Sequence, residues 1–152
     1  MIKEYKWVEV VCSTKETTRN GKYNRFSQII VLYPHFFTLD KIKQTSILEH
    51  EYWHHIWHKM PMLYKKIWEW LSNWKLIKTL NIMWLTKATT NSYVSSYAKK
   101  NIKEDWSECI EVDYLVKHHP DYKGTKLKAF ATYKMWIAVS MYNYFAKKEQ
   151  WN

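Results

Sequence analysis

Two segments near the N-terminus have the composition of strands. Residues 5–11 (YKWVEVV) and 23–33 (YNRFSQIIVLY) are rich in Val, Ile, Tyr and Phe, which favour extended structure. The segment 18–22 (TRNGK) lies between them and is a turn signal. This pattern predicts a β-hairpin at the front of the chain.

After this hairpin the apolar positions change to helical spacing. Apolar and aromatic residues recur every three or four positions up to Trp57, with Thr38 or Asp40 as a cap. Pro61 should end this first helix, because proline cannot continue the pattern of backbone hydrogen bonds.

Three more helices are expected. The second covers residues 61–87, the third begins after Asn101 as its N-cap and ends before Pro120, and the last covers residues 126–148. Strands at the front with helices packed against them predict one small α+β domain over residues 1–152. The apolar stripe of the second helix should consist of Leu63, Ile67, Trp70, Trp74, Ile77 and Trp84.

The composition favours a compact protein in a reducing compartment. Aromatic residues make up 18% of the chain and promise a core of large flat side chains. Cys12 and Cys109 are too few for a disulfide framework. Lys3, Glu4 and Lys6 interrupt any apolar leader, and no stretch reaches the about 20 apolar residues of a spanning helix. We therefore expect a cytoplasmic protein with no signal peptide and no transmembrane segment.

The candidate chemistry lies in the first predicted helix, in the segment LEHEYWHHIWHKM. His50, Glu51 and His54 form an H-E-x-x-H motif. Helical residues four apart lie on one face with their Cβ atoms about 6 Å apart, so the two imidazoles can bind one zinc ion. The glutamate between them can then reach a water on the metal. The competing interpretation is a pair of histidines buried in an aromatic core.

A tetrahedral site with a bound water needs a third protein ligand. The continuous form of the motif would need Gly at position 57 and His at position 60, where this chain has Trp57 and Met60. A form completed by Asp after Gly-Thr fails too, because Lys follows that pair here. A glutamate from a later helix remains, and the candidates on one face of the third helix are Glu104, Glu108 and Glu111.

The segment 96–108 (SYAKKNIKEDWSE) carries a resemblance to a known family. With the HEYWH motif, it resembles the zinc-binding pattern of the gluzincin metallopeptidases, most closely the catalytic domain of anthrax toxin lethal factor and its relatives. In those proteins a Ser-Tyr pair, an Asn and two Glu four residues apart occupy the same relative positions. The resemblance covers about residues 25–118 in order of elements. Trp53 departs from it where a small residue is usual, and Ser107 departs from it where Ala is usual.

This resemblance implies a zinc metallopeptidase that holds one zinc ion per chain. His50 and His54 would be zinc ligands, and Glu104 would be the third ligand. Glu51 would be the general base, and the hydroxyl of Tyr97 would stabilise the oxyanion.

Two more residues would support the ligands. The resemblance places Asn101 and Glu108 in the outer shell, where Glu108 would accept a hydrogen bond from a ligand imidazole. Asn101 and Glu104 also fit a capping box, in which Glu104 would bond the helix start instead. His55 and His58 should lie off the ligand face, solvated or half-buried.

The expected substrate is a peptide or a protein. A strand within residues 26–33 comes just before the zinc helix, and exposed sheet edges bind extended peptides through main-chain hydrogen bonds. The substrate should therefore lie antiparallel to this strand, along Gln28, Ile30 and Leu32.

The formal net charge of +10 supports a different class of function. In this alternative the chain is a catalytically inactive zincin-like binding protein, and its basic surface contacts nucleic acid or acidic partners. The lysines are spread along the chain, however, and no helix-turn-helix or zinc-finger spacing occurs. A third class is a peripheral membrane protein that uses the Trp and Lys residues of the segment 60–87 at an interface.

Overall fold

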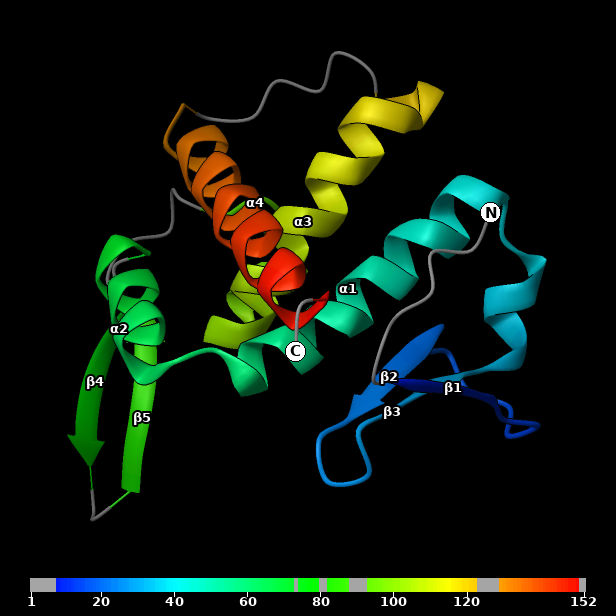
Figure 1. The fold of residues 1–152 in the computed structure, drawn as a ribbon, viewed down its shortest axis with the longest axis horizontal. Helices are drawn as coiled ribbons and strands as arrows, with labels where there is room; N and C mark the ends of the chain where they lie inside the picture. The colour runs from blue at the N-terminus through cyan, green and yellow to red at the C-terminus, as the bar shows by residue number, and fades with distance from the viewer. Residues whose placement is uncertain (1–7, 73, 80–81, 88–92, 123–128, 151–152) are drawn as a thin grey trace.

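The computed structural model describes residues 8–72, 74–79, 82–87, 93–122 and 129–150. Within these ranges a three-stranded sheet comes first, and most of the remainder is helical, with one separate hairpin of two strands (Figure 1). The predicted α+β class is confirmed, including the order of a front sheet followed by four α-helices.

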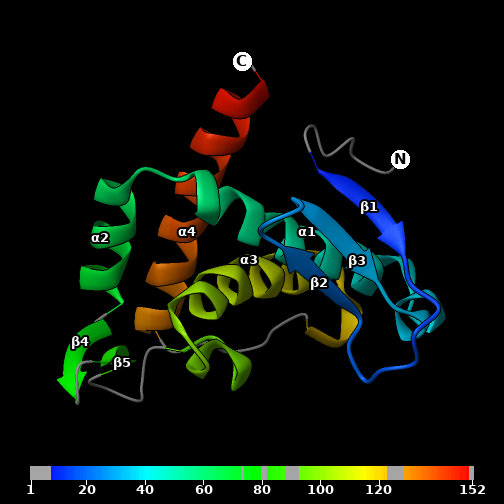
Figure 2. The same ribbon diagram turned by 90° about the horizontal axis from the view of Figure 1, so that it is seen from below.

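The front sheet consists of β1 (Glu9–Cys12), β2 (Gly21–Asn24) and β3 (Ile29–Leu32). The strand order is β1-β3-β2, so β3 is the central strand (Figure 2). β3 pairs parallel with β1 and antiparallel with β2. The expected hairpin between the first two strand-forming segments is therefore wrong, because the second segment contains two strands that pair with each other.

Local turn chemistry explains where the hairpin forms. The side chain of Asn24 accepts a hydrogen bond from the backbone N–H of Phe26 at 3.1 Å, which starts a tight turn directly after β2. Gln28 ends that turn in the left-handed region, with a φ of 55°. Asn20, in the segment expected to turn, instead accepts from the N–H of Tyr33 at 2.9 Å and so extends the pairing of β2 with β3.

Helix α1 (Lys41–Lys59) begins and ends where the sequence predicts. It follows a short 3-10 helix, η1 (Pro34–Thr38). The side chain of Asp40 caps α1 by accepting from the N–H of Lys43 at 2.9 Å. The helix stops directly before Met60 and Pro61.

Helix α2 (Met62–Leu71) is shorter than the predicted helix. The residues after it form an antiparallel hairpin of β4 (Trp74–Thr79) and β5 (Ile82–Lys87). The helix expected through residue 87 is wrong, because the segments WKLIKT and IMWLTK are rich in β-branched and aromatic residues that suit a strand as well as a helical stripe.

The described part of the expected apolar stripe does not lie in the core, and the side chains of Trp74, Ile77 and Trp84 lie outside the described ones. Within the described side chains, Trp70 is 81% exposed and Leu63 is 67% exposed, whereas Trp68 is fully buried. The buried face of α2 is therefore set by Trp68, which is not part of the predicted stripe.

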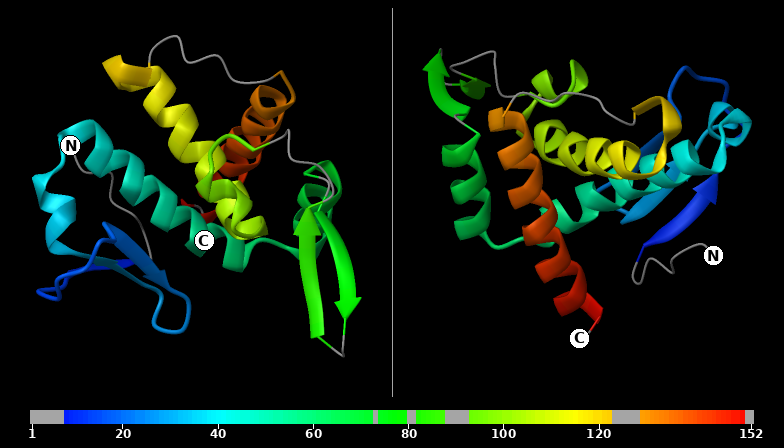
Figure 3. Two further views of the ribbon diagram at one scale, coloured as in Figure 1. Left: turned by 180° about the vertical axis from the view of Figure 1, so that it is seen from behind. Right: turned by 90° about the horizontal axis from the view of Figure 1, so that it is seen from above.

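Helix α3 (Ile102–His118) confirms the predicted third helix, and α4 (Ala129–Gln150) confirms the last one. The expected start of the last helix at residues 126–128 lies outside the described residues. α3 packs against both α1 and α4. β2 and α4 lie on opposite sides of α1, and α4 runs along the part of the molecule remote from the front sheet (Figure 3).

Tryptophan rings form the centre of the core. Trp106 of α3 lies with its ring centroid 5.5 Å from that of Trp53, 5.7 Å from that of Trp57 and 4.6 Å from that of Trp68. Trp53 also contacts Tyr142 of α4, with the ring centroids 3.8 Å apart. The large residue at position 53 therefore fills the space between α1 and α4, and it does not crowd the face that carries His50 and His54.

None of the helices in the described ranges combines the length and the apolar character needed to cross a membrane.

Candidate metal centre

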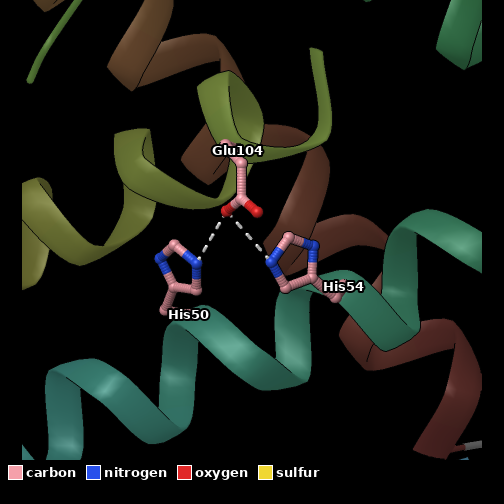
Figure 4. A group of neighbouring side chains, drawn as sticks. All are labelled: His50, His54 and Glu104. Carbon is pink, nitrogen blue, oxygen red and sulfur yellow. Dashed lines mark hydrogen bonds and ion pairs between the residues drawn. The ribbon is translucent and has the colours of Figure 1, made fainter. Parts of the chain in front are cut away.

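Three side chains from two helices converge at one point. The Nε2 atoms of His50 and His54 lie 3.1 and 3.2 Å from the same Oε2 atom of Glu104 (Figure 4). One possible ligand atom from each residue lies within 4.8 Å of the other two, which is close enough for all three to hold one metal ion. The structure thus brings together the three residues that the sequence predicts as ligands.

Helix capping fixes the position of Glu104. The side chain of Asn101 accepts from the backbone N–H groups of Lys103 and Glu104, at 3.0 and 3.1 Å. This N-cap places Glu104 in the first turn of α3, while its carboxylate points to the imidazoles on α1 (Figure 4). Asn101 is therefore a cap that positions Glu104, and the Glu104 carboxylate lies against the two imidazoles and not at the helix start as in a capping box.

The outer contacts of the imidazoles differ in part from those expected. Nδ1 of His50 lies 2.9 Å from Oε2 of Glu111 but 3.5 Å from Oε1 of Glu108. Glu108 instead accepts a hydrogen bond of 2.5 Å from the hydroxyl of Ser95. Glu111 is thus the closer of the two carboxylates to His50, and the role expected for Glu108 stays a prediction.

The second imidazole has a partner that the sequence reasoning did not identify. The hydroxyl of Ser107 lies 3.3 Å from Nδ1 of His54. Ser107 lies three residues after Glu104 and so faces the same side of α3, which is the signal that could have identified it. Alanine, which is usual at this position in the family that the sequence resembles, has no hydroxyl and could not make this contact.

The charges around His50 favour a cation. Burial would raise the pKa of Glu104, but hydrogen bonds from His50 and His54 outweigh it and hold this pKa far below its usual range. Burial also opposes a charge on His50, yet its bonds to Glu104 and Glu111 keep the pKa of His50 well above its usual value. Burial and then the charge of Glu111 raise the pKa of Glu108 to about 7. The carboxylates thus create a negative field at the imidazoles. This field stabilises a metal cation as well as it stabilises a proton on His50.

The carboxylate of Glu51 is held by the front sheet. Its Oε2 atom accepts a hydrogen bond of 2.6 Å from the backbone N–H of Tyr23 in β2. Gly21 allows this close approach, because a Cβ atom there would lie 3.2 Å from Cγ of Glu51 and 3.4 Å from a side-chain carbon of Ile47. Glu51 is 8% exposed and lines the same cavity as the two histidines.

Tyr97 lies at the rim of this cavity. It belongs to the short 3-10 helix η3 (Tyr97–Lys99), and its ring centroid is 6.3 Å from that of His50. Its hydroxyl accepts a hydrogen bond of 3.1 Å from Nζ of Lys100. Tyr97 is 48% exposed and lines the cavity, so it is not a core residue.

The expected substrate strand is corrected. Ile30 and Leu32 are 0% and 5% exposed in the central strand β3, and Gln28 lies in the turn before it. A central strand has neighbours on both sides and offers no edge to a peptide. β2 is the edge strand that borders the cavity, since Gly21 and Tyr23 line it.

The metal cleft, as we call this cavity, has a volume of about 700 Å³ and is bordered by β2, α1, η3 and α3. His58 lines it together with His50 and His54, but it is half-buried, as predicted, and does not belong to the group of side chains that can hold an ion. His55 is 1% exposed, and its Nδ1 lies 3.1 Å from the hydroxyl of Tyr23. His55 is thus a core residue, more deeply buried than expected.

The contacts of His50 lead to a prediction about metal affinity. We expect Glu111→Gln to weaken metal binding about 10–100-fold, because this substitution removes the carboxylate closest to the outer nitrogen of the His50 imidazole. Competition with a chelating dye measures the affinity, and the exposed Glu16→Gln serves as the control. If Glu108→Gln weakens binding and Glu111→Gln does not, Glu108 is the partner after all.

Searches against models of protein families, against curated proteins and against solved structures returned no match to this chain.

Proposed function

We propose that this protein is a zinc-dependent metallopeptidase that cleaves peptide bonds at the metal cleft. The proposal depends chiefly on one observation, namely that Glu51 lines the same cavity as the converging side chains of His50, His54 and Glu104. A site that only binds a metal needs the three ligand side chains. The additional buried carboxylate beside them supports a role in moving protons.

The donor set fits zinc. Two imidazole nitrogens and one carboxylate oxygen leave a fourth position for water, as in catalytic zinc sites. Glu111 and Ser107 lie against the outer nitrogens of the imidazoles, which supports the orientation that ligation requires. A zinc ion held by these residues would supply a Lewis acid and would lower the pKa of a water molecule to near 7.

Glu51 would carry the proton transfers. As the water oxygen forms a bond to the peptide carbonyl carbon, the Glu51 carboxylate takes the proton that the water loses. When the bond between this carbon and the amide nitrogen breaks, Glu51 donates the proton to the departing amine. The hydrogen bond from the Tyr23 N–H keeps the carboxylate in place during both transfers.

Tyr97 would stabilise the charge that develops on the carbonyl oxygen. Its hydroxyl already accepts from the Lys100 ammonium, and a hydroxyl that accepts from a cation becomes a stronger donor. A hydrogen bond that strengthens as the oxygen becomes negative lowers the barrier.

The substrate would extend along β2, and not along β3 as the sequence alone suggests. β2 is the edge strand beside the cleft. Tyr23 donates its N–H away from β3 to Glu51, so the outward-facing main-chain groups of this strand are directed toward α1 and the cleft. An extended peptide in the cleft would lie next to these groups and close to the metal ligands.

The metal content of the purified protein tests the proposal. We expect about one zinc ion per chain in the wild type, bound at least 100-fold more weakly in Glu104→Gln, because the variant loses an anionic ligand from the three-residue set. Atomic absorption and a chelator competition give these values. The exposed Glu16→Gln is the matched control. A wild type that takes up no zinc on reconstitution, or a Glu104→Gln variant that binds it equally well, contradicts the assigned site.

A further inference from the structure

One end of the metal cleft is basic. Arg25 and Lys103 line the cleft together with His58, one helical turn beyond His54 on α1. The Nζ atom of Lys65 in α2 lies 3.3 Å from the backbone carbonyl oxygen of His58 and so joins this group. We call Arg25, Lys65 and Lys103, which surround His58, the cation cluster.

The members of the cation cluster are close enough to affect one another. Burial lowers the pKa of His58, and the charges of Lys103, Lys65 and Arg25 lower it further. Burial and the charge of Lys103 likewise lower the pKa of Lys65. Groups from the β2–β3 turn, α2 and α3 thus place three like charges around His58.

Carboxylates balance this charge only in part. Burial and the charge of Arg25 lower the pKa of Lys103, and the charge of Glu104 opposes them. In the described part of the chain, no acidic side chain lies within ion-pair distance of Arg25, Lys65 or Lys103. The carboxylates Glu108 and Glu111 lie behind His50 instead. Like charges gathered without an ion-pair partner in the described part of the chain destabilise a fold, so their proximity indicates a role in binding an anion.

A second hollow continues the cleft at this end. It has a volume of about 380 Å³, and it shares Tyr23, Arg25 and His58 with the metal cleft. Phe26 lines it too, and the Arg25 guanidinium lies 4.4 Å from the centre of the Phe26 ring. The hollow thus offers a cationic wall and an apolar wall, which suit one long acidic side chain better than an extended phosphate backbone.

We propose that the cation cluster is a subsite for an acidic side chain of the peptide substrate, bound on the side of the metal beyond His54. This inference rests on the proposed function, because it takes the bound peptide to be a substrate. Binding of the acidic side chain does not itself require hydrolysis. Arg25 would contact the anion through its planar guanidinium, and Lys103 would approach it from the opposite side of the cleft. The preferred substrates would therefore carry Asp or Glu a short distance from the bond that is cleaved.

Peptide binding and peptide cleavage are measured separately to test this inference. The probes are pools of fluorescein-labelled ten-residue peptides. Each pool has Glu, Gln or phosphoserine fixed at one position and neutral residues at all the others. Fluorescence anisotropy gives their affinity for zinc-loaded Glu51→Gln protein, in which bound peptide should persist. Mass spectrometry gives cleavage by the wild type.

We expect at least one pool with Glu to bind about 10–100-fold more tightly than its Gln counterpart, as charge-assisted hydrogen bonds imply. The double substitution Arg25→Gln/Lys103→Gln is added to the Glu51→Gln protein. It should reduce the preference for Glu over Gln to within about threefold. The zinc content and the circular dichroism spectrum should not change. The matched control Lys15→Gln/Lys41→Gln removes two exposed charges outside the cleft and should retain the preference.

Each other outcome has a defined meaning. Equal binding of Glu and Gln pools, or a preference that survives Arg25→Gln/Lys103→Gln, overturns the subsite. Tighter binding of phosphoserine than of Glu supports the anion subsite and identifies a phosphorylated side chain as its ligand. Weakened binding of a single-stranded oligonucleotide without any effect on the peptides overturns the proposal in favour of nucleic acid. A preference for Glu without cleavage of any pool supports the subsite and contradicts the peptidase.

Discussion

Replacing Glu51 with Gln should lower kcat/KM for peptide hydrolysis by about 10²–10⁴-fold, the usual contribution of a general base. The amide can still accept the hydrogen bond from the Tyr23 N–H, so the side chain should keep its place. It cannot take a proton from water, however. Cleavage of a fluorogenic peptide selected from the pools above measures the effect.

The metal content distinguishes this result from a loss of the site. Glu51 lies outside the group of His50, His54 and Glu104 that can hold an ion, so Glu51→Gln should bind zinc with wild-type stoichiometry. Glu16→Gln, on the exposed surface, should be fully active. Unchanged hydrolysis in Glu51→Gln would remove Glu51 from the mechanism.

Lys134→Met should destabilise the fold by about 3–5 kcal/mol, the usual cost of breaking a buried ion pair by removing one partner. Nζ of Lys134 in α4 lies 2.7 and 2.8 Å from the two carboxylate oxygens of Asp105 in α3, and both side chains are 0% exposed. The variant leaves the buried carboxylate without this ammonium. Urea unfolding gives the free energy directly, and the melting temperature should fall by roughly 6–20 °C.

A surface pair provides the control for this experiment. Nζ of Lys117 lies 2.6 Å from Asp113, but the Lys117 side chain is 56% exposed, so Lys117→Met should cost at most about 1 kcal/mol. The double variant Asp105→Asn/Lys134→Met should recover part of the lost stability, since it removes both charges. If Lys134→Met and Lys117→Met lower the free energy of unfolding equally, burial does not make the Lys134–Asp105 pair more important for stability.

The metal site was the part of the molecule most accessible from sequence. His50 and His54 share a helix, so their spacing defines their geometry, and the Asp40 and Pro61 signals define where that helix begins and ends. Glu104 comes from a different helix, and no spacing rule relates it to α1. The resemblance supplied that residue, and the structure places it against both imidazoles.

The sheet and the outer contacts were less accessible for a physical reason. A strand-forming segment does not specify its partner, so the composition of β1 is compatible with pairing to either later strand. Glu108 and Glu111 are three residues apart on α3, and both therefore face His50. Only the packing angle of the two helices decides which carboxylate lies closer to the imidazole. Sequence pattern does not contain that angle.

The hydrogen bond between β2 and Glu51 has a consequence for how this site can change. Its donor is a main-chain group, so any amino acid at position 23 except proline supplies it equally. Alanine scanning of the cleft would therefore not detect this interaction. The amino acid at position 23 can vary without loss of the bond, provided that the strand keeps its register. In chains that share this architecture, a contact essential to the carboxylate could thus persist with no conserved residue to mark it.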